Sequence, residues 1–129
     1  LEHLSDFTTT LSTFNKLINK NGYLIVAVPN HESFDSKYYG KFWAGYDVPR
    51  HRFHFNKDAL IRSVEESNFE LIDSSPMFLD AFYISILSEK YKKNFFSFFK
   101  GVLIGTVSTF SYLITKNASS HYFVFKKSK

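Results

Sequence analysis

The feature that most constrains the fold is an uninterrupted apolar run, YLIVAV at residues 23–28, which ends at Pro29 and Asn30. A strand with one solvated face alternates apolar and polar residues, and this run does not alternate. It is typical of a strand covered by helices on both faces, so we expect it inside a parallel sheet and not at an exposed edge. Ligands of such sheets bind beyond the carboxyl ends of the strands, which makes the residues after Val28 candidates for a site.

The rest of the chain predicts alternating helices and strands. Ser5 or Asp6 can cap a first helix, and Asn21 and Gly22 are suited to the turn after it. Asn56 is a suitable N-cap for a later helix. The expected elements are a helix at about residues 7–18, a strand at 23–28, a helix at 57–67, a strand at 69–73, helix from residue 79 and a strand at 121–125.

Composition limits the classes of protein that fit. A chain of 129 residues with 44% hydrophobic content builds one core, so we expect one domain or part of one. The absence of cysteine excludes disulfides and thiolate chemistry, and a reducing cytoplasm is the expected location. The net charge of +4 is spread along the chain, which suits small anionic ligands but not a nucleic acid. The opening residues 1–6 lack a signal-peptide pattern, and we expect a trimmed product or a fragment.

The connection at residues 31–55 is long and has no clean periodicity. Long irregular segments in compact domains are often functional. Trp43 and Tyr46 belong to an aromatic cluster that forms either a small core of its own or a pocket for an acceptor. Arg50 can bind a carboxylate or phosphate, or pair with a nearby acid such as Asp47. His51 and His54 point to opposite sides of an extended segment, so we expect no metal site.

Residues 95–114 approach the length that a membrane-spanning helix needs. Lys100 and five Ser or Thr residues within this segment argue against a true span. Gly101 and Gly105 are four residues apart, a spacing that lets two helices pack closely. We expect a helical insertion that extends a pocket, contacts a membrane surface or contacts a second subunit.

Several segments in order resemble the class I S-adenosylmethionine-dependent methyltransferases, and are most similar to the ubiquinone-biosynthesis O-methyltransferases of the small-molecule branch. The matching segments are LEHL at 1–4, LINKNG at 17–22, VPN at 28–30, DVPRHRFHF at 47–55 and NF at 68–69. The resemblance implies an α/β fold, namely the C-terminal half of a Rossmann-like seven-stranded sheet with flanking helices. It also implies S-adenosylmethionine as cofactor and a small-molecule acceptor.

The resemblance divides residues 1–129, as one partial methyltransferase domain, into five segments. Residues 1–30 hold the end of strand four, a helix and strand five, and residues 31–55 form the substrate connection. The remaining segments are a helix and strand six at 56–75, the hydrophobic helical insertion at 78–116, and strand seven at 121–127, which is antiparallel and inserted between strands five and six.

The resemblance also assigns roles to named residues. Glu2 and His3 follow strand four, near the methionine end of the cofactor. The acidic-Gly-x-Gly-x-Gly turn that binds the cofactor in this family is not in the sequence, so the chain would be inactive without an N-terminal half. An imidazole accepts a proton near neutral pH, which makes His3, His51 and His54 the candidate catalytic bases. The expected substrate-binding residues are Asn30, Trp43, Tyr46, Arg50, His51 and His54.

Two other functions fit the same residues. One is a non-catalytic α/β interaction module that has kept the fold without the cofactor site. The other is a peripheral membrane-binding protein that uses residues 95–114. Neither explains the order and spacing of the matching segments as well as methyl transfer does. The sequence does not specify the oligomeric state.

Overall fold

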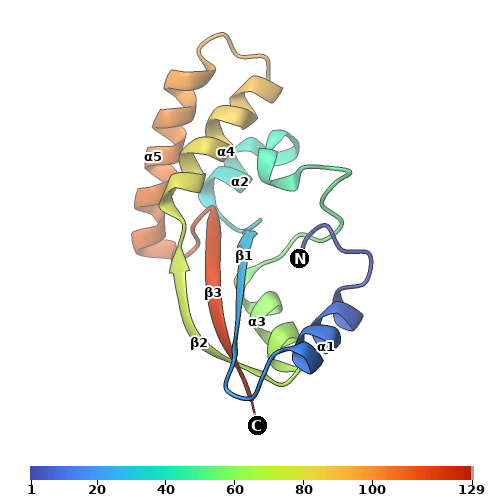
Figure 1. Cartoon of the computed structure of the whole chain (residues 1–129). Coiled ribbons are helices and arrows are strands. Elements are labelled where there is room, and N and C mark those ends of the chain that lie inside the picture. Colours follow the sequence, from blue (N-terminus) through green and yellow to red (C-terminus); the bar gives the residue numbers. More distant parts are fainter. Residues whose placement is uncertain (129) are drawn as a thin grey trace.

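The computed structural model describes residues 1–128, and within them the chain folds into a three-stranded sheet with helices (Figure 1). The predicted range 1–129 includes Lys129, which lies outside the described residues. The elements in chain order are α1 (Phe7–Leu17), β1 (Tyr23–Pro29), α2 (Phe34–Tyr39), η1 (Gly40–Phe42), η2 (Ala44–Tyr46), α3 (Lys57–Glu65), β2 (Phe69–Pro76), α4 (Phe78–Tyr91), α5 (Ser97–Thr115) and β3 (Ser120–Lys127).

The sheet has the strand order β1-β3-β2, and β3 is antiparallel to both of its neighbours. Val26 of β1 lies opposite Phe123, and Leu71 of β2 lies opposite Phe125. The position of the last strand between the other two, antiparallel to them, is therefore confirmed. Because β1 and β2 both run antiparallel to β3, their carboxyl ends meet at the same edge of the sheet, next to α4 and α5 (Figure 1).

The expected burial of residues 23–28 on both faces is wrong for the part of the chain that is described. β1 is an edge strand, and Tyr23 and Ile25 are 59% and 68% exposed. Val26 and Val28, which point to the other face, are buried. The physical reason is that α1 and α3 cover one face of the sheet only (Figure 1). The apolar residues on the second face have no cover among residues 1–128.

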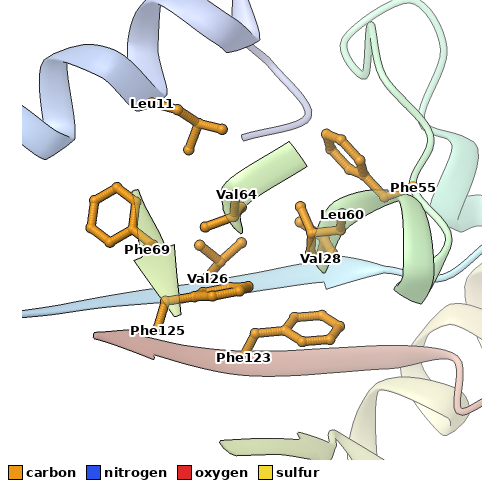
Figure 2. Close-up of a cluster of buried hydrophobic side chains, with 9 residues drawn as sticks. All are labelled: Leu11, Val26, Val28, Phe55, Leu60, Val64, Phe69, Phe123 and Phe125. Carbon is orange, nitrogen blue, oxygen red and sulfur yellow. The ribbon is translucent and has the colours of Figure 1, made fainter. Parts of the chain in front are cut away.

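The main core lies between the sheet and these two helices (Figure 2). Phe123 and Phe125 of β3 are fully buried at its centre. Burying each such ring stabilises the fold by about 2–3 kcal/mol. The buried members are Leu11, Val26, Val28, Phe55, Leu60, Val64, Phe69, Phe123 and Phe125.

Local signals account for the helix boundaries near this core. Asp6 caps α1 by accepting a hydrogen bond of 3.0 Å from the Thr9 N–H, and Asn56 caps α3 by accepting one of 2.8 Å from the Ala59 N–H. Asn21 and Asn68 adopt left-handed φ values of 63° and 62° before β1 and β2. These caps confirm the predicted starts of α1 and α3. α3 ends at Glu65, two residues before the predicted end, and β2 extends to Pro76, three residues beyond its predicted end.

The connection at residues 31–55 contains α2, η1 and η2, which its lack of periodicity did not predict. It builds a second core in which Tyr39 and Trp43 pack against Ile84 of α4 and Ile104 of α5. The hypothesis that the aromatic cluster forms a core of its own is thus confirmed, although α4 and α5 supply part of that core.

Asp35 holds this second core together. Its carboxylate is fully buried and accepts three hydrogen bonds of 2.7 Å, from Trp43 Nε1, Ser108 Oγ and Ser119 Oγ. These donors come from the connection, from α5 and from the residue before β3. One carboxylate therefore joins three segments that are far apart in the sequence.

Helices α4 and α5 form an antiparallel hairpin that packs across two glycines. A Cβ at Gly101 would lie 2.5 Å from Ile86 Cα, and one at Gly105 would lie 2.8 Å from Phe82 Cα. Both distances are too short for any side chain, so the predicted close packing across Gly101 and Gly105 is confirmed. Within the described residues, α5 is one helix that is long and apolar enough to cross a membrane by length and composition alone.

We expect Asp35→Asn to lower the free energy of unfolding by about 3 kcal/mol, because an amide cannot accept all three buried hydrogen bonds. Urea denaturation followed by circular dichroism measures the change. Asp73→Asn is the matched control, since Asp73 is exposed on β2 and the same substitution there should cost less than about 0.5 kcal/mol. Equal losses in the two variants would contradict the role of Asp35.

We expect stability to fall as the pH is lowered from about 6.5 to 4. Burial, with a smaller effect from Lys57, lowers the pKa of His121 to about 4, and its Nε2 accepts a hydrogen bond from the Ala118 N–H. In this window the unfolded chain binds the proton that the folded chain excludes. Each pH unit therefore removes at most about 1.4 kcal/mol of stability.

Unfolding midpoints measured at several pH values test this dependence. His121→Gln should flatten it, because the glutamine does not titrate. An unchanged slope in His121→Gln would show that other groups cause the acid sensitivity.

Candidate functional site

A cavity of about 260 Å³ lies at the edge of the sheet where β1 ends and α4 begins. This is the edge at which ligands bind in open α/β sheets. Polar and aromatic side chains line it together, a mixture typical of small-molecule sites. The lining residues are Pro29, Ala44, Gly45, Asp47, Arg50, His51, Asp80, Tyr83, Ile84, Leu87, Tyr91 and Ser120.

His51 is the predicted base that lines this cavity. Its side chain is 11% exposed, and its Nδ1 lies 3.0 Å from the main-chain oxygen of Gly45. A carbonyl only accepts, so Nδ1 carries the proton and Nε2 keeps a free lone pair. Nε2 lies 3.8 Å from a carboxylate oxygen of Glu2 and 3.8 Å from one of Asp47. An imidazolium formed by proton uptake at Nε2 would be stabilised by these two carboxylates.

His3 lies beside His51, with the two ring centroids 4.6 Å apart. The Arg52 N–H donates a 2.7 Å hydrogen bond to the Glu2 main-chain oxygen and so holds the two segments together. Glu2, His3 and His51 each offer one ligand atom, and these atoms lie within 4.8 Å of one another. The expected absence of a metal site rested on His51 and His54, whereas this group joins His51 to two residues of a distant segment.

Glu2 and Arg50 are charged groups at the site. The Glu2 side chain is 15% exposed, and its carboxylate lies 3.8 Å from His51 Nε2 and 4.0 Å from His3 Nε2. Arg50 pairs with Asp47 at 2.8 Å, which raises the pKa of the guanidinium. The ion pair named for Arg50 from the sequence is therefore present. The Arg50 side chain is still 72% exposed beside the cavity, so binding of an anionic group stays a prediction.

His54 and Tyr46 lie together on the other side of His51. The Nε2 of His54 lies 3.1 Å from the Tyr46 main-chain oxygen, and the two rings meet edge to face. His54 lines a separate space of about 10 Å³, which has room for about one water molecule. His51 and Glu2 also line this small space, whereas His54 does not line the larger cavity, and a role for His54 and Tyr46 with substrate stays a prediction.

Asn30 and Trp43 are buried and already bonded within the protein. Asn30 Nδ2 donates to Asn117 Oδ1 and to the Ala118 main-chain oxygen, and Asn30 Oδ1 accepts from the Glu32 N–H. Trp43 is 2% exposed and donates its indole N–H to Asp35. These contacts order the connection that carries His51, and direct substrate contact by either residue stays a prediction.

Sequence reasoning missed the wall of the cavity that α4 provides. Asp80, Tyr83, Leu87 and Tyr91 line it from one side of this helix. Their spacing of three and four residues is the signal that could have identified them, because it places mixed polar and aromatic side chains on one helix face.

Comparison with known families gives a match over residues 1–74 to a model described as a methyltransferase domain. The match covers more than half of the chain. This chain belongs to the methyltransferase domain family. A comparison with curated protein sequences gave no match.

Three solved structures share the fold. Haemonchus contortus phosphoethanolamine N-methyltransferase 2 with S-adenosyl-L-methionine aligns with TM-score 0.52 and 15% identity over 99% of this chain and 31% of that chain. The same enzyme with phosphomonomethylethanolamine and S-adenosylhomocysteine gives 0.53 and 13% over 99% and 32%. The [4+2]-cyclase SpnF gives 0.52 and 12% over 94% and 44%.

These alignments establish the α/β fold, and this chain spans only about a third to less than half of the length of those proteins. The family match favours an enzyme domain over the non-catalytic module and over a protein that only binds membranes.

We expect His51 and His54 to adopt opposite neutral tautomers above their titration range. His51 should carry its proton on Nδ1, which faces the Gly45 oxygen, and His54 on Nε2, which faces the Tyr46 oxygen. Long-range ¹H–¹⁵N correlation spectra distinguish the two forms. The same tautomer on both residues would contradict the arrangement that leaves His51 Nε2 free as a base.

Proposed function

We propose that this chain supplies the substrate-side half of a class I S-adenosylmethionine-dependent methyltransferase that acts on a small-molecule acceptor. The observation that carries the proposal is the cavity at the carboxyl ends of β1 and β2, with the free Nε2 of His51 beside it. The family match and the placement of β3 between β1 and β2 support it.

The exposed parts of the sheet support the assignment to the C-terminal half of a larger sheet. β1 pairs with β3 on one side only, and Tyr23 and Ile25 leave its second face bare. An apolar edge strand of this kind is a template for a further strand. In the proposed domain, strand four pairs there, and helices of the other half cover the bare face. The relation to the ubiquinone-biosynthesis O-methyltransferases, within the seven-stranded class, is part of this proposal.

The residues of this chain do not fit the whole cofactor. Phosphate- and nucleotide-binding turns need glycines between a strand and a helix. Gly22 lies between α1 and β1, at the end of the sheet opposite the cavity, and Gly101 and Gly105 serve helix packing (Figure 1). The adenosine part therefore needs residues outside this chain, and Glu2 and His3 are proposed to contact the methionine end. When bound, the cofactor supplies an electrophilic methyl group.

In this proposal, the residues of this chain bind the acceptor and take up the proton that it loses. Tyr83 and Leu87 offer apolar and aromatic contacts, and the exposed Arg50 offers a cation to an acceptor in the cavity. His51 Nε2 takes the proton from an acceptor hydroxyl or amine, and Glu2 and Asp47 stabilise the resulting imidazolium. General-base catalysis of this kind contributes about 10²–10⁴-fold to a rate.

The test uses the longest open reading frame that contains this chain, and the chain alone, in titrations with S-adenosylhomocysteine. We expect the longer product to bind and the chain alone not to bind. Failure of the longer product to bind would overturn the proposed cofactor. Binding by the chain alone would overturn the half-domain assignment.

In the longer product, His51→Gln should lower the transfer of radiolabelled methyl to small molecules of a cell extract by about a hundredfold without weakening S-adenosylhomocysteine binding. Lys20→Gln, in the turn at the far end of the sheet, is the control and should leave transfer unchanged. Unchanged transfer in His51→Gln would remove the proposed base.

A further inference from the structure

The outer face of α5 is apolar along the whole helix. One stripe of large side chains recurs at steps of three and four residues, which places all of them on one side. All of them are exposed, and Ile114 at the end of the helix is 87% exposed. We call this set the outer stripe: Phe99, Leu103, Val107, Phe110 and Ile114.

The inner face of the same helix carries mostly small and polar residues. Gly101, Gly105 and Ser108 are buried there against α4 and α2, and Ser108 bonds to Asp35. Apart from Ile104, the inner residues are small or polar, and the large apolar residues lie outside. This is the arrangement of helices whose outer face contacts lipid. In a soluble helix the large apolar residues face the core.

The tip of the α4–α5 hairpin presents aromatic residues from a fixed loop. Asn94 donates hydrogen bonds of 2.6 Å and 3.0 Å to the side chain and main chain of Glu89, and Lys100 pairs with Glu89 at 3.4 Å. Phe95 lies in this loop and is 92% exposed. The exposed ring therefore stands on a loop that is tied to both helices.

Both ends of the outer stripe are positively charged. Residues 90–116 contain five lysines and no acidic residue. Lys90, Lys92 and Lys93 are exposed at the tip, and Lys116 is exposed just beyond the other end of α5. Basic residues that flank an exposed apolar stripe are complementary to anionic lipid headgroups around acyl chains.

A second copy of the chain fits this surface less well. Two α5 helices packed through their outer stripes, in either direction, would bring lysine-bearing ends together without an acidic partner in residues 90–116. Such like-charge contacts disfavour association. An anionic bilayer instead offers the opposite charge along both ends.

The hairpin is also the wrong length to cross a bilayer. α4 has 14 residues, about 21 Å of helix, against a hydrocarbon core of about 30 Å. A spanning hairpin would place the shorter helix and the buried Glu89 within that core. A helix that lies along the surface keeps Lys92, Lys93 and Lys116 among the headgroups.

We propose that α5 lies in the surface of an anionic membrane, with the outer stripe and the tip phenylalanines inserted into one leaflet. This membrane contact adds to the methyl-transfer activity and does not depend on it. The lysines at both ends of α5 contact the lipid headgroups, and the polar inner face stays packed on α4 and α2. The partner is a lipid surface that carries negative charge.

The full chain is tested by flotation with vesicles of phosphatidylcholine alone or mixed with phosphatidylglycerol. We expect flotation with the mixed vesicles, and at least tenfold weaker binding for Phe99→Gln with Phe110→Gln. The matched control is Leu17→Gln with Tyr23→Gln, which removes two exposed apolar side chains elsewhere and should float as the parent does. Circular dichroism and unfolding midpoints establish that both double variants are folded.

Lys92→Gln with Lys93→Gln should weaken binding to the mixed vesicles, and added salt should weaken binding of the parent chain. Phe110→Trp should be quenched by brominated acyl chains if the stripe inserts, whereas Trp43 is buried and gives a constant background.

The proposal is overturned if the parent chain does not float with the mixed vesicles, or if the stripe and control variants float equally. It is also overturned, in favour of a second copy, if size-exclusion chromatography shows a dimer that the stripe variant converts to a monomer without any vesicle binding. A failure of the methyl-transfer tests leaves all of these readouts unaffected.

Discussion

The second core, at the α4–α5 end of the molecule, depends on the hydrogen bonds that the buried carboxylate of Asp35 accepts. A charge without solvent is tolerated only when its hydrogen bonds are satisfied, and three donors satisfy this one. Because Trp43, Ser108 and Ser119 come from separate segments, the connection, the hairpin and the start of β3 take their relative positions from one group. Removing any donor would leave the others around a less compensated charge.

The candidate site takes its geometry from this network. Trp43, held by Asp35, precedes η2, and the Gly45 oxygen in η2 accepts a hydrogen bond from the Nδ1–H of His51. A Cβ at Gly45 would lie 2.5 Å from the Trp43 ring, so the indole and this carbonyl are packed together. The orientation of His51, which leaves its Nε2 free, therefore depends on a series of contacts through Gly45 and Trp43 to Asp35. Asp35 itself does not line the cavity.

The features of the fold that depend on local chemistry could be predicted from the sequence. Those that depend on long-range contacts could not. Asp6, Asn56 and Asn68 act through hydrogen bonds or backbone angles within a few residues, so their positions in the sequence sufficed. The exposed face of β1 was not predictable, because an apolar run does not reveal which helices are present to cover it. The pairing of His51 with Glu2 and His3 joins segments 48 or more residues apart, and Asp35 carries no local pattern that distinguishes it from a solvated acid. The resemblance to a family placed Glu2 and His3 near a site.

The same physical constraint explains why two apolar helices of this chain behave in opposite ways. In α1 the inward position of Leu11 demands only apolar volume, so the apolar stripe turns toward the core. In α5 the inward positions are taken by Gly101 and Gly105, which permit close approach to α4, and by Ser108, which Asp35 requires. With 19 residues of mostly apolar sequence and an inner face that holds Ile104 and otherwise small or polar groups, α5 directs most of its large side chains outward. The exposed stripe is thus a consequence of how the hairpin is held, and it persists as long as Asp35 stays bonded.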